Sequence, residues 1–247
     1  YDKDPPTFFD VLTDRRQRDR VEELIVKHEE MDVLPSNIDL LQAEHELTIA
    51  DLVARVKHDP NMDIDPSALA SLGINVSPDA VTGPHALDVL DEVLSGVEDA
   101  YDYVIIDSPP FYGKLTDTGI YAAQHILVPA LTEATSERAI ELLIDQMAAL
   151  EGQTDITVET LGVVANRVEK TNEDRMMLEW LNEVFDEFPL WEVRKRVALQ
   201  RAFKSGKSVF AADESVDMAD VFLDIAADFD ERFGFETADS IYEVTHD

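Results

Sequence analysis

Two patterns of hydrophobic and polar positions alternate along the chain: short uninterrupted apolar runs, and longer stretches with helical periodicity. The uninterrupted runs are Tyr103–Ile106, Ile126–Pro129 and Leu161–Ala165, and each predicts a strand that is buried on both faces. Met31–Pro35 is a further short strand candidate. Strands that are separated by helices favour an α/β fold, with a mostly parallel twisted sheet flanked by helices.

The helical pattern, with apolar residues three and four positions apart, recurs between these runs. It predicts helices over Leu40–Lys57, His85–Val97, Ser136–Leu150, Thr171–Phe188 and Met218–Phe233. Prolines and glycines over 59–84 predict a long loop or insertion, with a short helix around Ser67–Leu72. No clean linker divides 1–234, which is predicted to be a single α/β domain followed by a loose acidic tail, 235–247.

The composition narrows the class of protein. Hydrophobic residues make up 45% of the 247 residues, which is enough for a packed core. No apolar run reaches the roughly 20 residues that are needed to cross a bilayer. The lack of cysteine excludes disulfides, thiolate zinc sites and cysteine-bound iron–sulfur clusters. Because no signal peptide opens the sequence, we expect a cytoplasmic protein.

The formal charge of −33, from 53 acidic and 20 basic residues, is extreme. Such an excess is typical of disordered chains. Here the acidic residues are spread through periodic apolar patterns, which indicates a folded protein instead. We interpret the excess as a halophilic surface, adapted to a salt-rich cytoplasm in which ions screen the repulsion.

One of the apolar runs is followed directly by a candidate functional residue. Asp107 directly follows Tyr103–Ile106, and the strand is expected to stop at Pro109 and Pro110 because proline cannot extend a ladder of hydrogen bonds. A carboxylate at the carboxyl end of a parallel strand emerges where open α/β sheets bind ligands. The alternative is a core strand with a polar end, whose carboxylate caps the turn at Ser108–Pro110.

Seven segments, in order between residues 7 and 210, resemble motifs of the ParA/MinD branch of the P-loop ATPases. These segments are Thr7–Leu12, Met31–Leu40, Asp107–Pro110, Leu115–Thr116, Ile126–Pro129, Gly162–Arg167 and Ser205–Phe210. Asp107-Ser-Pro-Pro resembles the D-x-P-P form of the Walker B motif, whereas Ser208 stands where the family usually has a proline. The resemblance is strongest to the ParA/Soj partition ATPases, and it implies the hydrolysis of ATP.

The resemblance also implies a missing segment. The family begins with a phosphate-binding loop, K-G-G-x-G-K-[ST], and a second strand that ends in D-x-D-P-Q, and neither is in this sequence. Because the chain begins with Tyr1, we expect a fragment that lacks the N-terminal βαβ portion and is inactive and poorly soluble by itself. Gly206-Lys207-Ser208 spells the end of such a loop, but we reject it because Arg201 occupies the position that requires glycine.

The resemblance assigns roles to residues that follow the predicted strands. Asp107 would be the catalytic and metal-binding residue, which helps to hold Mg²⁺ beside the phosphates of ATP. Asn166 and Arg167 would contact the nucleotide, Asn166 through the donor and the acceptor of its amide. Lys195 and Arg196 would also lie near the nucleotide. The alternative for Asn166 is a side chain that satisfies backbone groups of a loop.

Residues 194–207 contain six basic residues and no acidic residue, within a very acidic chain. Non-specific DNA binding requires positive charge that faces phosphates, and the resemblance implies such binding by the C-terminal region. The DNA-binding candidates are Arg194, Arg201, Lys204 and Lys207. The alternative is a solvated helix that pairs with neighbouring acids.

Three functions follow from these observations. The resemblance implies a plasmid or chromosome partition ATPase, in which an ATP-dependent homodimer binds DNA without sequence preference and a ParB-like centromere-binding protein stimulates hydrolysis. This protein would be cytoplasmic and associated with the nucleoid through DNA. A MinD-like positioning ATPase is the second hypothesis, but the acidic stretch 236–247 is unlike a basic membrane-binding helix, so no stable membrane association is expected. The third is a non-catalytic interaction module, if this chain is the whole product.

Overall fold

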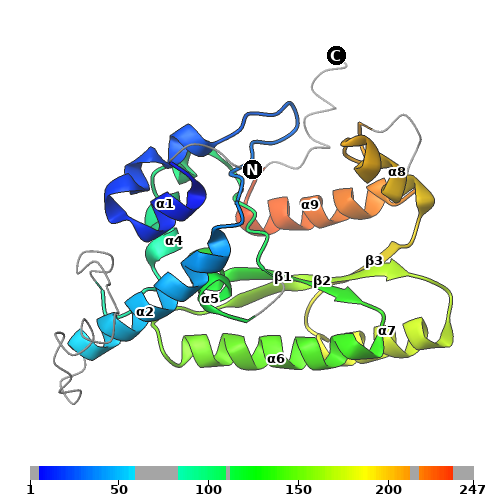
Figure 1. The fold of residues 1–247 in the computed structure, drawn as a ribbon. Helices are drawn as coiled ribbons and strands as arrows, with labels where there is room; N and C mark the ends of the chain where they lie inside the picture. Colours follow the sequence, from blue (N-terminus) through cyan, green and yellow to red (C-terminus); the bar gives the residue numbers. More distant parts are fainter. Residues whose placement is uncertain (1–5, 59–82, 110–111, 212–216, 236–247) are drawn as a thin grey trace. The chain divides into compact units, whose positions relative to one another are not determined.

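The computed structural model describes residues 6–58, 83–109, 112–211 and 217–235 (Figure 1). Its contacts divide the chain into two compact units, one formed by 1–124 with 149–158 and the other by 125–148 with 159–247. The helix expected around Ser67–Leu72, the last proline of the D-x-P-P segment and the tail from 236 onward lie outside the described residues. No helix in the described ranges is long and apolar enough to cross a membrane.

The first unit is helical in its described part. Its helices are α1 (Phe8–Thr13), η1 (Arg15–Leu24), α2 (Leu40–His58), α4 (Val89–Leu94), η2 (Glu98–Ala100) and α5 (Lys114–Ala123). Leu12, Leu47 and Leu90 belong to an apolar cluster that joins α1, α2 and α4. Val11 and Val21 belong to a second cluster, which joins α1 and η1 to α4.

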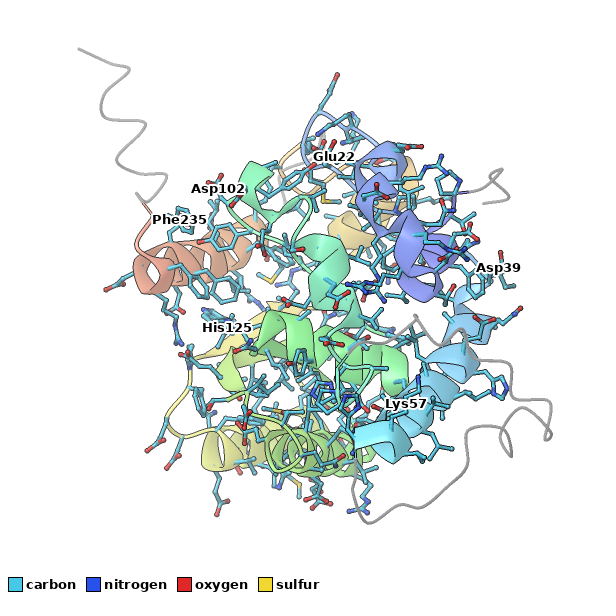
Figure 2. The ribbon with its side chains drawn as sticks, turned by 90° about the vertical axis from the view of Figure 1, so that its left-hand side faces the viewer. Glu22, Asp39, Lys57, Asp102, His125 and Phe235 are labelled. Atoms are coloured by element: carbon cyan, nitrogen blue, oxygen red, sulfur yellow. The ribbon has the colours of Figure 1, made fainter. Side chains whose placement is uncertain are left out.

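Helix α2 confirms the prediction for Leu40–Lys57 to within one residue. In Figure 2, Asp39 and Lys57 lie at opposite ends of this helix, so an acidic residue precedes its first turn and a basic residue lies in its last turn. Charges of these signs complement the helix dipole. The carboxylate of Glu44 in α2 accepts hydrogen bonds from the backbone N–H groups of Lys114 and Leu115, at 2.7 and 2.8 Å, and thereby caps α5.

The predicted buried strand at Tyr103–Ile106 is wrong. No strand pairs with this segment among the described residues, and the side chain of Ile105 is 90% exposed. Ile106 packs against the apolar cluster that contains Leu47. An apolar run predicts burial, but a strand also requires a neighbouring strand for its backbone hydrogen bonds.

Two other predictions for the first unit need correction. Met31–Pro35 forms no strand: its one pairing is an isolated antiparallel bridge between Val26 and Val33. The helix expected over His85–Val97 is reduced to the six residues of α4. The 3₁₀ helix η1 was not anticipated, because its many charged residues hide the apolar positions that Val21 and Leu24 occupy.

The second unit contains a parallel three-stranded sheet in the order β1 (His125–Leu131), β2 (Glu159–Val168) and β3 (Leu190–Arg194). Helices α6 (Ala134–Glu151) and α7 (Asn172–Val184) cover one face, and α9 (Ala219–Phe233) covers the other (Figure 1). This arrangement confirms the predicted α/β fold with a parallel sheet flanked by helices. It also confirms two of the predicted strands and three of the predicted helices, with ends that differ by a few residues.

The core of this sheet lies between β1, β2 and the helices α6 and α7. Val128, Val163 and Leu181 are buried there, together with Ile140 of α6. On the opposite face, Trp191 of β3 packs edge to face against Phe229 of α9, with ring centroids 6.4 Å apart. The sheet is therefore held on both faces, which fixes the positions of the residues that follow each strand.

Candidate functional site

A cavity of about 220 Å³ lies at the carboxyl ends of the parallel strands in the second unit. Thr132 lies just past β1, Asn166 and Arg167 lie near the end of β2, and Lys195 lies just past β3. The other residues that line it are Leu131, Glu133, Glu169, Thr171 and Asp174. This edge is where open α/β sheets bind ligands. The structure thus brings together three of the predicted nucleotide-binding residues.

Arg167 has a left-handed backbone, with φ of +60°. The register of the β2–β3 pairing shifts at this residue: Asn166 pairs with Val193, whereas Val168 pairs with Arg194. Such an irregularity in a strand changes the direction of nearby side chains, and side chains at adjacent strand positions otherwise point to opposite faces. Asn166 and Arg167 are adjacent, yet both line the cavity. The backbone at Arg167 therefore contributes to the shape of the site.

Asp174 connects the elements around the cavity. One of its carboxylate oxygens accepts a hydrogen bond from the Thr132 hydroxyl, and the other accepts from the hydroxyl and the backbone N–H of Thr171, at 2.6 and 3.0 Å. The Thr171 hydroxyl accepts from the Asp174 N–H in return, which completes a capping box at the start of α7. Asp174 thus ties the end of β1 to α7.

The environment of Asp174 keeps its carboxylate ionised. Burial by itself raises the pKa of Asp174, but the hydrogen bonds from Thr132 and Thr171 outweigh it and lower the pKa to about 2. The sequence reasoning missed both Asp174 and Thr132 as site residues. A usable signal was present, because Thr171-Asn-Glu-Asp174 has the spacing of a capping box directly before a helical pattern.

The basic residues that follow β3 have acidic partners. The Lys195 ammonium contacts the carboxylate of Glu169, which also lines the cavity. The Nε atom of Arg196 lies 2.9 Å from a carboxylate oxygen of Asp217, and the Nη2 atom of Arg194 lies 4.0 Å from the same oxygen. The first part of the basic run, residues 194–196, therefore pairs with acidic residues, as the alternative to DNA binding predicts. Arg196 does not line the cavity.

The rest of the basic run belongs to α8 (Val197–Ser205) and its C-terminal cap. Arg201, Lys204 and Lys207 are exposed. Gly206 ends the helix with φ of +68°, and the N–H of Lys207 donates to the Ala202 carbonyl at 3.2 Å. A phosphate-binding loop precedes a helix, whereas Gly206-Lys207-Ser208 follows one. The structure supports the rejection of this segment as a phosphate-binding loop.

Asp107 lies in the first unit, where its side chain is exposed. Its neighbour Ser108 packs against α5: a Cβ atom at Gly119 would lie 3.3 Å from the Ser108 hydroxyl oxygen. No group of three or more His, Asp or Glu residues in the described ranges is arranged to hold a metal ion. A single carboxylate suits Mg²⁺, which keeps several water ligands and binds through one or two carboxylates with the phosphates of a substrate.

Comparisons with known proteins agree with this architecture. A sequence family described as an AAA domain matches residues 3–160. The cell division protein PomZ of Myxococcus xanthus is 30% identical over 158 residues, which are 63% of this chain and 49% of PomZ. A ParA family protein of Chlamydia pneumoniae is 27% identical over 188 residues, which are 75% of this chain and 72% of that protein. The matched region thus spans about half the length of PomZ.

The fold is also similar to that of Cyanothece McdA in its complex with ATP, with a TM-score of 0.67 and 17% identity over 96% of this chain and 78% of McdA. At that identity, the likeness shows the fold alone. The family match includes Asp107 but ends before Asn166. The identification of Asn166, Arg167 and Lys195 as site residues therefore depends on the geometry of the second unit. Because the match covers more than half of the 247 residues, the chain belongs to the ParA/MinD-type family of P-loop ATPases.

Proposed function

We propose that this chain provides the base-binding cavity, the Mg²⁺-binding carboxylate and the DNA-binding surface of a ParA-type positioning or partition ATPase. The observation that carries the proposal is the convergence of Asn166, Arg167 and Lys195 on one cavity at the carboxyl ends of parallel strands. Lys195 is far from Asn166 and Arg167 along the sequence, and the pairing of β2 with β3 brings it to the same cavity. Their chemistry suits a ligand with a hydrogen-bonding ring and negative charge.

Each cavity residue has a distinct role in this proposal. The amide of Asn166 can donate to and accept from the edge of an adenine ring. Arg167 and Lys195 supply positive charge to an anionic ligand, which would compete with Glu169 for Lys195. Asp174 is a positioning residue, because its hydrogen bonds fix the end of β1 and the start of α7. The residues present therefore fit the base of ATP and a nearby negative charge.

Asp107 is the proposed partner of the metal. When bound, ATP and Mg²⁺ supply the phosphoryl group and the charge that stabilises it. Asp107 would hold Mg²⁺, through a bound water, by means of an exposed carboxylate that has room for such a water. This carboxylate and the cavity residues belong to different units.

DNA, a ParB-like protein and a second copy of the chain are the proposed partners. The exposed Arg201, Lys204 and Lys207 support DNA contact, because cations in a segment without acids can face phosphates. Arg194 is the weakest candidate because Asp217 lies close to its guanidinium. Similarity to a ParA family protein and to PomZ supports both partition and positioning as the cellular role.

ATP turnover by the native protein, measured with and without duplex DNA, tests the proposal. We expect DNA-dependent hydrolysis of ATP with Mg²⁺, and a loss of at least about tenfold in Asp107→Asn. Asp102→Asn is the matched control, because Asp102 is an exposed carboxylate in the same segment (Figure 2); its turnover should stay within about twofold of the native value. Hydrolysis that is equal in the native protein and Asp107→Asn would reject the role of Asp107.

A further inference from the structure

Phe203 is the least buried large aromatic side chain among the described residues, with 88% of its surface exposed. It lies on α8, a helix that already uses one side to attach to its own unit. Ala198 and Leu199 pack on that side against the apolar cluster of Val193 and Met218, and Ala202 is 4% exposed. The packing of the unit therefore accounts for the apolar residues on the inner side of α8, and it does not account for Phe203.

The exposed arc of α8 combines apolar and basic side chains. Residues at i, i+4 and i+7 share one face of a helix. Val197, Arg201 and Lys204 have this spacing, and all three are exposed. Phe203 follows at the next position around the exposed arc, beyond Gln200. The arc carries no acidic residue, although the whole chain has a formal charge of −33.

We propose that Phe203 makes an apolar contact with the sugars and bases of duplex DNA, beside phosphate contacts of Arg201 and Lys204. This inference rests on the proposed function and adds a residue of another chemical kind to the same surface. Contacts between cations and phosphates weaken steeply as salt rises, because binding releases counterions. Apolar side chains that press against or between bases are used by proteins that bind DNA without reading its sequence. Phe203 would thus supply affinity that salt does not remove.

Two other occupants of this arc fit the structure less well. A helix that lies in a membrane surface buries a broad apolar face, whereas most apolar residues of α8 face its own unit and leave Val197 and Phe203 exposed. Lysine is depleted in the core of a protein interface, whereas here Lys204 lies on the arc itself. Arg201 and Lys204 lie on the same exposed arc as Phe203, and their positive charge complements a polyanion.

The test is the salt dependence of binding to a labelled duplex, measured by fluorescence anisotropy with ATP and Mg²⁺ over a series of KCl concentrations. We expect Phe203→Ala to lower the affinity about tenfold at every salt concentration, without a change in the slope of log K against log[KCl]. The double variant Arg201→Ala/Lys204→Ala should reduce the magnitude of that slope by about 2. Phe203→Trp should restore binding, and Phe235→Ala, at an exposed phenylalanine after α9, should bind like the native protein (Figure 2).

The outcomes separate this inference from the proposed function. If the native protein binds DNA and Phe203→Ala binds equally well, the role of Phe203 is rejected and the DNA-binding function stands. A Phe203→Ala variant that changes the slope, or that loses binding to anionic phosphatidylserine vesicles while keeping DNA binding, would also reject it. If the native protein does not bind duplex DNA with ATP, this inference falls together with the DNA-binding part of the proposed function. Thermal unfolding of each variant checks that its fold is retained.

Discussion

The Nε atom of Arg196 lies 2.9 and 3.0 Å from the two carboxylate oxygens of Asp217, whereas the adjacent Lys195 contacts Glu169 at the cavity. Two neighbouring cations thus face different partners. This difference determines which of them can reach a ligand in the cavity.

We therefore predict that Lys195→Ala weakens the binding of ATP about tenfold, because it removes a charge-assisted contact. Arg196→Ala should change the affinity by less than about twofold, since its guanidinium is held by Asp217. Titration with a fluorescent ATP analogue measures both. Equal losses in the two variants would show that Arg196 leaves Asp217 to bind the nucleotide.

Asp174→Asn should lower the free energy of unfolding by about 1–3 kcal/mol near pH 7, because it disturbs hydrogen bonds from Thr132 and Thr171 to a buried carboxylate. The pKa of Asp174 is lowered to about 2 from a model-peptide value of 3.8, so its stabilising contribution is present above pH 3.8 and is lost as pH falls through about 2. Urea unfolding at several pH values measures the difference between the native protein and the variant. This difference should shrink in acid.

Glu173→Gln is the control for Asp174, because Glu173 is an exposed acid in the same first turn of α7. It should change the unfolding free energy by less than about 0.5 kcal/mol. A pH-independent difference between the native protein and Asp174→Asn would show that the charge of Asp174 does not contribute.

Gly162→Ala should destabilise the second unit by at least about 2 kcal/mol. A Cβ atom at this position would lie 2.3 Å from Cζ3 of Trp191 and 2.9 Å from the Pro189 carbonyl oxygen. Because Trp191→Leu would remove the closest contact, it should recover part of the loss when combined with Gly162→Ala, and a double-mutant cycle measures this coupling. Additive effects of the two substitutions would contradict a direct clash.

Salt should stabilise this protein. A formal charge of −33 gives strong repulsion in the folded state, which ions screen. We predict that the melting temperature rises between low salt and molar KCl, and that sucrose at the same osmolality gives a smaller rise. A melting temperature that does not change with KCl would contradict the interpretation of a halophilic surface.

Sequence patterns were most informative where local periodicity and burial agree. Leu40–Lys57 and Ile126–Pro129 were recovered because part of their apolar positions, such as Leu47 and Val128, face a core within their own unit, although Leu41 and Leu52 are exposed. The strand predicted at Tyr103–Ile106 was wrong because a continuous apolar run predicts burial but does not show whether a neighbouring strand is present to pair with it. The short strand β3 has one buried residue, Val193, and a single buried position gives no periodic pattern from which the strand could be predicted.

The candidate site was predicted in part. Asn166, Arg167 and Lys195 were found because they follow buried strands or match a family motif, and the sheet places them around one cavity. The left-handed backbone at Arg167 could not be predicted, since no glycine or asparagine marks it. The pairing of Arg196 with Asp217 depends on a contact between positions 21 residues apart, which no local pattern encodes.

Isothermal titration of ATP with Mg²⁺ into the native protein and Asn166→Ala tests the central claim most directly. The cavity at the carboxyl ends of the strands should bind adenine through the Asn166 amide, so the affinity for ATP should fall about tenfold and the preference for ATP over GTP should narrow. Unchanged affinity and unchanged preference in Asn166→Ala would show that the nucleotide binds elsewhere.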